Sequence, residues 1–380
     1  MRTPNATNRT MIGKSVTPSK RLAILQHNLC SGGCERMMVN LATEWSQGGI
    51  AVDLVLVRRE GAYLPLVPPT VRIVDLGARR TFTAIPPLVR YLRRVRPRAL
   101  LSGLVHINTV ALLAKKLAPE TRVVISERNT PSVDFRDRQP AARLGYRLAP
   151  YLYPGADAIV AVSEGVANDL ATFAGLSRDR IYVIRNPVVT RETMTSARQH
   201  FAHRWFEPGE PPVIIAAGRL AEAKDYPTLL HAFAKLRAVR RCRLMILGEG
   251  ELLKNLTELA SILGITPDVD FLGFVINPYA VMTRAALLVL SSRWEGSPNV
   301  LVEAMACGLP VVSTDCPSGP REILAGGRFG PLVPVGDAEG LAAAMARTLE
   351  YPTPHHLLEE ASRPYRSDQA ASRYLNAMYA

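Results

Sequence analysis

Residues 291–308 read Ser-Ser-Arg-Trp-Glu-Gly-Ser-Pro-Asn-Val-Leu-Val-Glu-Ala-Met-Ala-Cys-Gly and directly follow an apolar run, Ala285–Leu290. The apolar run predicts a buried strand, and the polar residues after it predict a loop. We expect a helix to begin at Pro298, which suits the first helical position, and to stop before Gly308, which suits the left-handed residue past a helix end. Strand, loop and helix in this order predict a parallel α/β layer, with a phosphate-binding helix N-terminus at its edge.

Two acidic residues accompany this predicted helix start. Glu295 lies in the loop, and Glu303 lies eight residues later, about one turn into the helix. Carboxylates beside a phosphate site suit the hydroxyl groups of a sugar and a ribose, which donate hydrogen bonds to them. Taken alone, such a pair is more often one solvated acid and one helix-surface acid.

A second strand-loop-helix unit lies upstream and favours the binding interpretation. Val213–Ala217 predicts a strand, and Gly218, Arg219 and Lys224 follow it. Arginine offers a forked donor and lysine a point charge, the two forms in which proteins hold a diphosphate. Two chance surface cations are the alternative in a chain with 46 lysine and arginine residues. The strand end, the glycine and the following helix count against that alternative.

Together these residues resemble glycosyltransferase family four, whose members are retaining enzymes with the GT-B fold. Glu295 and Glu303 match that family's two glutamates with seven residues between them, and Gly218, Arg219 and Lys224 match its diphosphate-binding stretch. The resemblance runs from about Leu22 to the C-terminus. Smaller matches are Ser31–Arg36, Ile125–Pro131, Ala161–Gly165, Arg185–Pro187 and Asp315–Glu322. Two of these strings look most like members that build bacterial surface polysaccharides and lipid-linked oligosaccharides.

The resemblance implies an α/β fold of the GT-B type, with two Rossmann-like parallel-sheet domains facing across a cleft. Independently, seven apolar runs before residue 188 and five after it alternate with helical stretches, the pattern of parallel α/β layers. The predicted divisions are a disordered tail at 1–19, an N-terminal acceptor-binding domain at 20–188, a C-terminal nucleotide-sugar-binding domain at 189–362 and a helix at 363–380 that returns to the N-terminal domain.

The family pattern also implies site roles. Glu303 is expected to hold ribose hydroxyls, Glu295 the donor sugar, and Arg219 and Lys224 the diphosphate, which itself takes the acceptor proton on leaving. The further nucleotide-sugar contacts expected are Gly33, Gly218, Gly248, Phe274, Val275, Gly296, Asn299 and Val300. His106 has two interpretations, a catalytic residue near the sugar or a hydrogen-bonded core histidine. Glu127 and Arg128 are expected to bind the acceptor, with a buried structural ion pair as the alternative.

No metal or cofactor is expected. Asp268 and Asp270 form an Asp-x-Asp, but they enter a predicted strand at the sheet edge away from ligands, so we interpret them as surface residues. The histidines lack the spacing of a metal-ligand set. Gly32 and Gly33 follow the first strand, yet Arg36 stands where a dinucleotide fingerprint needs its third glycine, which makes a Rossmann dehydrogenase a poor match.

Charge is unevenly distributed along the chain. Residues up to Thr190 contain 27 basic and 13 acidic residues, a net +14, whereas the remainder contains 19 and 20, a net −1. A basic half attracts a polyanion, and Arg90–Arg98 and Phe135–Pro154 read as basic amphipathic segments of the kind that lie on anionic membranes; a solvated helix face is the alternative. Aromatic residues are not interleaved as in single-strand nucleic-acid binders. No apolar stretch is long enough to span a bilayer, and five scattered cysteines favour a reducing compartment.

The sequence therefore predicts a retaining hexosyl- or N-acetylhexosaminyltransferase that uses a nucleotide-diphospho sugar and a lipid-linked or polysaccharide acceptor in cell-surface glycan biosynthesis. UDP as the carrier rests on the habit of the family. We expect a cytoplasmic protein attached peripherally to the inner face of the cell membrane, with no nucleic acid as partner. A non-hydrolysing sugar-nucleotide epimerase and a basic nucleic-acid-binding protein are the alternatives. The sugar, the linkage, the acceptor and the oligomeric state stay open.

Overall fold

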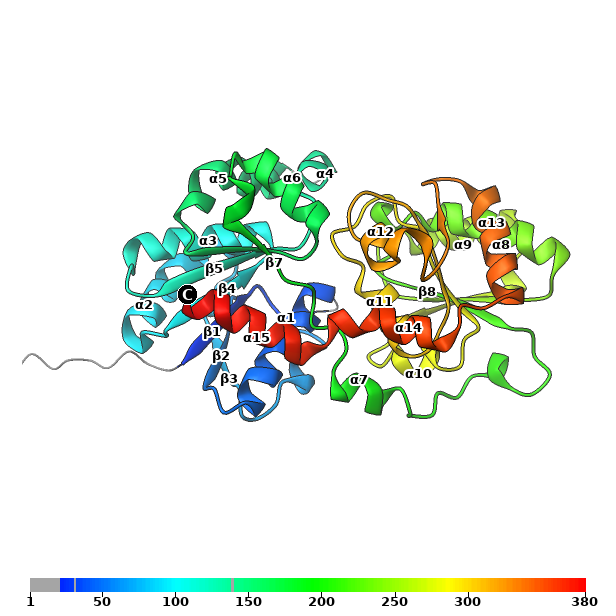
Figure 1. Ribbon diagram of the computed structural model, residues 1–380, viewed down its shortest axis with the longest axis horizontal. Helices are drawn as coiled ribbons and strands as arrows, with labels where there is room; N and C mark the ends of the chain where they lie inside the picture. The colour runs from blue at the N-terminus through cyan, green and yellow to red at the C-terminus, as the bar shows by residue number, and fades with distance from the viewer. Residues whose placement is uncertain (1–20, 31, 138–139) are drawn as a thin grey trace, which may run out of the picture.

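The computed structural model describes residues 21–30, 32–137 and 140–380 and consists of two α/β domains, each built on one parallel sheet (Figure 1). The predicted tail at 1–19 and Ser31 lie outside the described residues. The fold prediction is confirmed, because both sheets are parallel throughout and helices cover them. Parallel strands are covered on both faces and therefore read as continuous apolar runs.

Among its described residues, the N-terminal domain contains seven strands in the order β3-β2-β1-β4-β5-β6-β7. The strands are β1 (Leu22–Gln26), β2 (Val52–Leu56), β3 (Arg72–Asp75), β4 (Ala99–Gly103), β5 (Arg122–Glu127), β6 (Ala158–Ala161) and β7 (Ile181–Val183). The helices are α1 (Gly33–Gln47), α2 (Ile85–Val95), α3 (Val105–Leu117), α4 (Pro131–Asp137), α5 (Pro140–Leu152) and α6 (Glu164–Ala174). Strand order reverses between β1 and β4, the position at which ligands bind in open parallel sheets.

The C-terminal domain contains six strands in the order β10-β9-β8-β11-β12-β13. The strands are β8 (Val213–Ala217), β9 (Arg243–Leu247), β10 (Val269–Gly273), β11 (Leu287–Leu290), β12 (Val311–Thr314) and β13 (Leu332–Val333). The helices are α7 (Arg191–Ser196), α8 (Tyr226–Val239), α9 (Leu253–Ile262), α10 (Tyr279–Met282), α11 (Asn299–Ala306), α12 (Pro320–Ile323), α13 (Ala338–Glu350), α14 (His355–Ser362) and α15 (Ser367–Tyr379). The two-residue strand β13 escaped prediction because it is too short to form an apolar run.

Helix α11 differs at one end from the expectation. Pro298 is the N-cap residue, with extended backbone, and the first helical residue is Asn299. Gly308 lies just past the helix end with a φ of +75°, the left-handed backbone that was predicted. The start of α11 therefore lies one residue later than expected and presents its free N–H groups at the carboxyl edge of the sheet.

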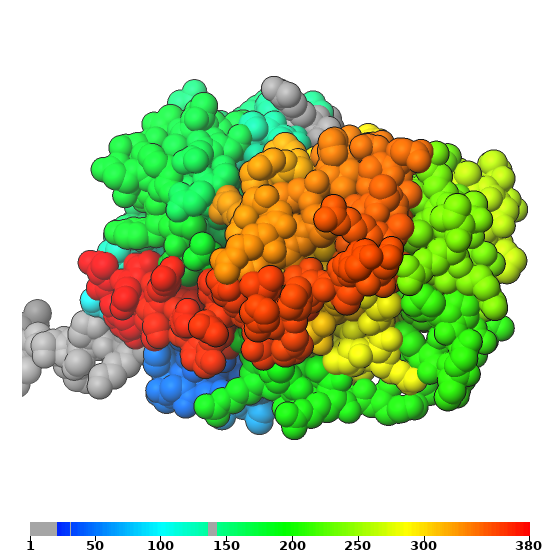
Figure 2. Space-filling model, turned by 45° about the vertical axis from the view of Figure 1, so that its right-hand side comes forward, coloured from blue at the N-terminus to red at the C-terminus, as the bar shows by residue number. Residues whose placement is uncertain are grey.

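The last helix, α15, leaves the C-terminal domain and packs against α1, β4 and β5 (Figure 1). In the space-filling view, the red C-terminal segment lies beside the green and blue segments of the N-terminal domain (Figure 2). Tyr374 is fully buried there, and the Trp45 indole donates a hydrogen bond of 3.1 Å to the carbonyl of Ala371. Where the chain crosses, the Ser367 N–H donates to the carbonyl of Val189, next to the predicted 188/189 boundary. Within the described ranges, no helix is long and apolar enough to cross a membrane.

Candidate active site

The predicted diphosphate lysine and the predicted sugar carboxylate contact each other. Lys224 follows β8, and Glu295 lies in the loop after β11. The Lys224 Nζ donates a hydrogen bond of 2.5 Å to Glu295 Oε1, and the Ser292 hydroxyl donates one of 2.6 Å to the same oxygen. The side chains of Lys224 and Glu295 are only 22% and 12% exposed. Because an ammonium group has three N–H donors, Lys224 keeps donors for a second anion.

Loops at the carboxyl edge of the second sheet lie against one another beside this pair. A Cβ on Gly248 would lie 2.0 Å from the carbonyl oxygen of Gly218, and one on Gly250 would lie 2.3 Å from that of Leu220. Gly248 also has a φ of +145°, which favours glycine. Arg219 is exposed on the first loop, and its guanidinium makes no hydrogen bond with the described residues. An exposed cation therefore lies on one of these closely packed loops.

Glu303 lies on α11, eight residues after Glu295 in the sequence. The Tyr279 hydroxyl donates a hydrogen bond of 3.4 Å to Glu303 Oε1. Burial raises the pKa of Glu303, while the charge of Arg36 and the Tyr279 hydrogen bond lower it. The structure thus gives the two predicted carboxylates different surroundings. Glu295 forms an ion pair with a lysine, whereas Glu303, which is partly exposed, accepts a hydrogen bond from a tyrosine.

A hydrogen-bond chain joins the start of α11 to the N-terminal domain. The Asn186 Nδ2 donates a hydrogen bond of 2.7 Å to Asn299 Oδ1, and the Arg128 Nη1 donates one of 2.8 Å to Asn186 Oδ1. Gly33 lies opposite, because a Cβ there would be 3.2 Å from Asn299 Nδ2. The predicted residues Gly33 and Asn299 therefore meet across the cleft from different domains.

Gly296 is a second point of contact between the domains. A Cβ on Gly296 would lie 1.9 Å from the Arg128 carbonyl oxygen, so only glycine fits. The Ser163 hydroxyl donates 2.8 Å to the Gly296 carbonyl, and the Thr130 hydroxyl donates 2.9 Å to the carbonyl of Glu295. The predicted loop of Glu295 is thus held by backbone contacts to the N-terminal domain.

Glu127 and Arg128 lie inside the N-terminal domain, 1% and 6% exposed. The Tyr153 hydroxyl donates 2.8 Å to Glu127 Oε2, and burial raises the pKa of Glu127 to about 7. The Arg128 Nη2 donates 3.3 Å to the Tyr374 hydroxyl, in addition to the Asn186 bond. The two side chains form no ion pair with each other among the described contacts. Acceptor binding by these two residues stays a prediction, and the geometry favours a supporting role.

His106 lies in the first turn of α3, at the carboxyl end of β4. Its ring is 6.1 Å from the ring of His27, in an edge-on arrangement, and it is only partly exposed. Leu104 just before it has a φ of +75°, a conformation that side chains rarely adopt and that often occurs at functional sites. The position is the reversal point of the first sheet, although the role of His106 stays a prediction.

Phe274, Val275 and Val300, three of the predicted nucleotide-sugar contacts, pack against different hydrophobic cores. The Phe274 ring lies 5.9 Å from the Tyr63 ring, edge to face, and Phe274 packs against the hydrophobic core of the N-terminal domain. Val275 and Val300 pack instead against the core of the C-terminal domain. The N–H of Gly248 donates a hydrogen bond of 2.7 Å to the carbonyl of Gly273, which links this region to the loops predicted to bind the diphosphate.

No group of three or more histidine, cysteine, aspartate or glutamate side chains that could hold a metal occurs among the described residues. Asp268 and Asp270, which we interpreted as surface residues, are both partly exposed. The Asp268 side chain is 14% exposed and accepts hydrogen bonds from Arg237 at 2.7 Å and Arg243 at 2.5 Å. Asp270, 38% exposed, hydrogen-bonds His203 at 3.0 Å. Both aspartates therefore serve structural ion pairs and hydrogen bonds.

Three polar residues of the cleft had no assigned role before the structure was known. Asn186 links Arg128 to Asn299, and Glu322 accepts hydrogen bonds from the N–H groups of Glu164 and Gly165 at the start of α6, at 3.0 and 2.8 Å. Arg36 reaches from α1 to the pocket of Glu303. Asn186, Glu322 and Arg36 all stand in short strings that match the family pattern, which is the signal that pointed to them. Their partners lie far away in the sequence, so their roles were not visible there.

The chain matches known glycosyltransferases over nearly its whole length. Residues 211–351 match the family described as "Glycosyl transferases group 1", and residues 31–192 match the one described as "Glycosyltransferase Family 4". A relative from Campylobacter jejuni, N-acetylgalactosamine-N,N'-diacetylbacillosaminyl-diphospho-undecaprenol 4-alpha-N-acetylgalactosaminyltransferase, is 30% identical over 342 residues, which cover 87% of this chain and 90% of the relative. This chain therefore belongs to glycosyltransferase family 4 and is a glycosyltransferase of the GT-B fold.

Two further similarities support that assignment. The lipopolysaccharide core biosynthesis glycosyltransferase LpsE of Rhizobium meliloti is 34% identical over 205 residues, 54% of this chain and 57% of LpsE. Among solved structures, HepE of Anabaena in complex with UDP-glucose superposes with a TM-score of 0.78 at 18% identity, covering 94% of this chain and 99% of HepE. The structural match shows a shared fold.

Proposed function

We propose that this glycosyltransferase moves a hexosyl or N-acetylhexosaminyl group from a UDP-sugar to a hydroxyl group of a lipid-linked glycan, with retention of the anomeric configuration. The observation that carries the proposal is the ion pair of Lys224 and Glu295 beside the start of α11, with Glu303 on that helix hydrogen-bonded by Tyr279. The cations and the free N–H groups of α11 suit a diphosphate, and the two carboxylates suit the hydroxyl groups of a sugar and a ribose.

The chemistry asked of these residues is electrostatic. As the bond between sugar and diphosphate breaks, negative charge grows on the leaving phosphate, where Lys224, Arg219 and the N–H groups of α11 would stabilise it. The leaving phosphate takes the proton of the acceptor hydroxyl, so no protein nucleophile is needed. Glu295 would hold the sugar hydroxyls and fix the orientation of Lys224. Glu303 would hold the ribose.

The lipid-linked acceptor is proposed from the relatives. The Campylobacter relative is named for a diphospho-undecaprenol acceptor, and LpsE is named for lipopolysaccharide core biosynthesis. The UDP carrier is proposed from HepE, whose structure contains UDP-glucose. A membrane-embedded acceptor also agrees with the basic N-terminal half of this chain.

The test is a donor screen by mass spectrometry. The protein is incubated with a panel of UDP- and GDP-sugars and synthetic undecaprenyl-diphosphate glycans, with and without EDTA, and the anomeric configuration of any product is determined. We expect one UDP-sugar to give an α-linked product with EDTA present. An inverted product or a strict metal requirement would contradict the mechanism. Conversion of a UDP-sugar to its epimer without acceptor would favour the epimerase alternative.

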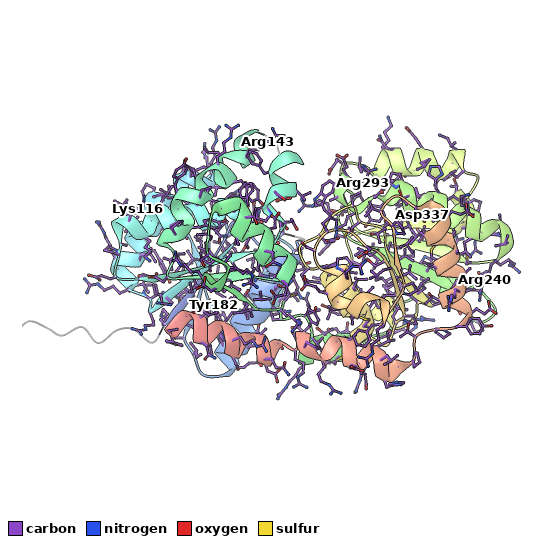
Figure 3. All side chains as sticks on the ribbon, turned by 45° about the horizontal axis from the view of Figure 1, so that its top comes forward. Lys116, Arg143, Tyr182, Arg240, Arg293 and Asp337 are labelled. Atoms are coloured by element: carbon purple, nitrogen blue, oxygen red, sulfur yellow. The ribbon has the colours of Figure 1, made fainter. Side chains whose placement is uncertain are left out.

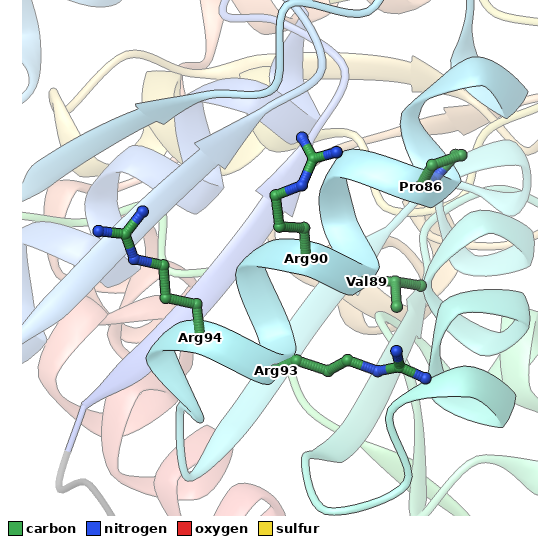
Figure 4. Close-up of a pocket in the computed structure, with 5 residues that line it drawn as sticks. All are labelled: Pro86, Val89, Arg90, Arg93 and Arg94. Carbon is green, nitrogen blue, oxygen red and sulfur yellow. The ribbon is translucent and has the colours of Figure 1, made fainter.

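We also propose that the N-terminal domain attaches peripherally to the inner, anionic face of the cell membrane. Helix α2 buries Leu88, Val89, Tyr91 and Leu92 and exposes its arginines, as predicted. Arg90 and Arg94 extend from one side of α2 and Arg93 from the other, around a shallow hollow of about 460 Å³ (Figure 4). Arg93 donates to the carbonyl of Leu117, whereas Arg90 and Arg94 have no hydrogen-bond partner within the described ranges.

Helices α3 and α5 extend this basic face. Lys116 lies at the end of the N-terminal domain farthest from the C-terminal domain (Figure 3). On α5, Arg147 is exposed together with Tyr151, at 81%. Tyr146 and Tyr153 were grouped with them in the sequence but are buried in the core, which corrects the extent of the predicted amphipathic segment. Exposed cations and an exposed tyrosine suit lipid headgroups.

Flotation with liposomes tests the attachment. Anionic headgroups attract each nearby cation by roughly 1 kcal/mol, so binding should rise with phosphatidylglycerol content and fall with salt. It should be lost when Arg90, Arg93, Arg94, Arg96 and Arg98 become glutamine. The matched control changes five exposed arginines of the other half, Arg191, Arg198, Arg204, Arg241 and Arg363. Equal binding to neutral and anionic vesicles, or equal loss in both variants, would contradict an oriented electrostatic attachment.

A further inference from the structure

Arg36 is a buried cation that the proposed reaction does not yet use. It lies in the first turn of α1 and is 8% exposed. Its guanidinium carbon is 5.6 Å from the centre of the Tyr63 ring and 5.8 Å from the centre of the Tyr279 ring. Both distances are in the range of cation–π contacts. Tyr63 belongs to the N-terminal domain and Tyr279 to the C-terminal domain, so Arg36 is held between the two.

The packing around Arg36 fixes its position. Its neighbour Met37 is 1% exposed and belongs to the hydrophobic core of the C-terminal domain, although α1 is part of the N-terminal domain. The backbone N–H of Arg36 donates 3.2 Å to the carbonyl of Gly32, which closes the first turn of α1. A buried arginine in a fixed place, with no carboxylate within 4 Å among the described contacts, is costly unless its charge serves a nearby group.

Glu303 is the group that gains from this charge. The Tyr279 hydroxyl, on the same ring that contacts Arg36, donates to Glu303 Oε1 at 3.4 Å. The other titratable groups that face Glu303 are Tyr63 and Cys307, whose pKa values burial raises to about 12, so both are neutral at pH 7. Burial raises the pKa of Glu303, and Arg36 is the charged group that lowers it.

We infer that Arg36 is a positioning residue supplied by the N-terminal domain, which acts on Glu303 through their shared contact with Tyr279 and prepares this carboxylate to accept hydrogen bonds from ribose hydroxyls. The inference rests on the proposed ribose role of Glu303. It links the nucleotide affinity of the C-terminal domain to contact with the N-terminal domain. An ionised acceptor forms stronger hydrogen bonds with hydroxyl donors than a protonated one.

UDP binding measured by calorimetry from pH 6 to pH 9 tests this role. Arg36→Gln should weaken UDP binding about 10-fold, and the loss should be larger at pH 6 than at pH 9, because the charge of Arg36 lowers the pKa of Glu303 and its removal favours the protonated carboxyl. Arg36→Lys keeps the charge and should restore much of the affinity at pH 7. Titration of the UDP phosphate is common to all variants. Arg373→Gln, on the exposed face of α15, is the matched control.

The Glu303→Gln background separates the possible failures. There, Arg36→Gln should change UDP affinity less than threefold and the pH dependence of the two variants should coincide. If Arg36→Gln weakens UDP binding equally at all pH values, or equally with and without Glu303, Arg36 acts on the nucleotide or on folding, and the inference is overturned. If Glu303→Gln itself binds UDP like the parent, the ribose role in the proposed function fails instead.

Discussion

Glu127 and Glu295 each lie on the carboxyl side of a parallel strand, one in each sheet, yet the structure gives them opposite environments. Each lies at or just past the carboxyl end of a parallel strand, at the edge where ligands bind. Glu127 is 1% exposed, is hydrogen-bonded by the neutral Tyr153 and has a pKa raised by burial to about 7. Glu295 contacts the cation Lys224 at 2.5 Å. Position at a strand end is therefore insufficient to identify a ligand-binding carboxylate, because burial and the neighbouring charge decide what it can do.

The same contrast applies to the cations of the two edges. The Arg128 guanidinium donates hydrogen bonds to Asn186 and Tyr374 inside the protein. Arg219 is exposed instead, and Lys224 has N–H donors left for a second partner. At the edge of the N-terminal sheet, Arg128 makes structural hydrogen bonds. At the edge of the C-terminal sheet, Arg219 and Lys224 supply the charges that the proposed reaction needs. Mutations at the two edges should therefore change different quantities.

The largest effect is expected for Lys224→Ala. Each charge-assisted hydrogen bond contributes roughly 1.5–3 kcal/mol, and Lys224 would make one to Glu295 and one to the diphosphate. We expect kcat/KM in the transferase assay to fall by about 10² to 10⁴, with the unfolding midpoint changed far less. Lys254→Ala removes a lysine from a loose surface pair, 3.9 Å from Glu258, and serves as the control. If kcat/KM of Lys224→Ala falls less than threefold, Lys224 does not bind the diphosphate as proposed.

Arg128→Met tests the N-terminal side. The substitution removes two hydrogen bonds from a buried charged donor and leaves Asn186 and Tyr374 without that partner. We expect the free energy of unfolding to fall by about 3 kcal/mol, measured by urea denaturation, with Arg373→Met as the exposed control. If stability is unchanged and acceptor KM rises instead, Arg128 is a ligand contact and the two edges are more alike than we infer.

The pH dependence of stability tests the burial of Glu127. The ordinary pKa of the carboxyl is 4.5 and the folded value is about 7. Between these values the folded protein keeps a proton that the unfolded chain releases, so the contribution of Glu127 to stability is present below pH 4.5 and is lost as the pH rises through 7. Glu127→Gln has no such proton. Relative to wild type, it should gain up to about 3 kcal/mol of stability between pH 4.5 and pH 8.

Urea denaturation at several pH values measures this difference. Glu120→Gln, which changes an acid 67% exposed on the same domain, is the control and should show almost no pH-dependent gain. A flat difference between Glu127→Gln and wild type from pH 4.5 to pH 8 would mean that Glu127 is solvated or paired with a cation, as Glu295 is.

The smallest effect is expected at the contact between the edges. Glu322, on α12, accepts hydrogen bonds from two N–H groups at the start of α6. A carboxylate at a helix N-terminus contributes about 0.3–1 kcal/mol, so Glu322→Gln should raise the donor KM about two- to fivefold with kcat nearly unchanged. Glu360→Gln, in a surface pair with Arg328, is the control. An increase in affinity would show that this contact holds the cleft closed against the donor.

Local features of this chain could be predicted from the sequence because they depend on neighbouring residues. Apolar runs predicted twelve of the strands, and β1, β8 and β9 have the predicted bounds. Gly308 ends α11 in the left-handed conformation, and Glu295 and Glu303 lie on the predicted loop and helix. These are consequences of hydrophobic periodicity and backbone sterics, which act over a few residues.

Tertiary structure alone decided the environments of the site residues. The burial of Glu127, the bond between Lys224 and Glu295 and the place of Arg36 between Tyr63 and Tyr279 all depend on chain segments that meet only when two sheets and two domains pack. Charge and burial set the pKa and the hydrogen-bonding capacity of a side chain, and both are sums over surrounding atoms from any part of the chain. The type of each residue and its place on a strand, loop or helix could therefore be predicted from the sequence. The residue that it contacts in the other domain could not.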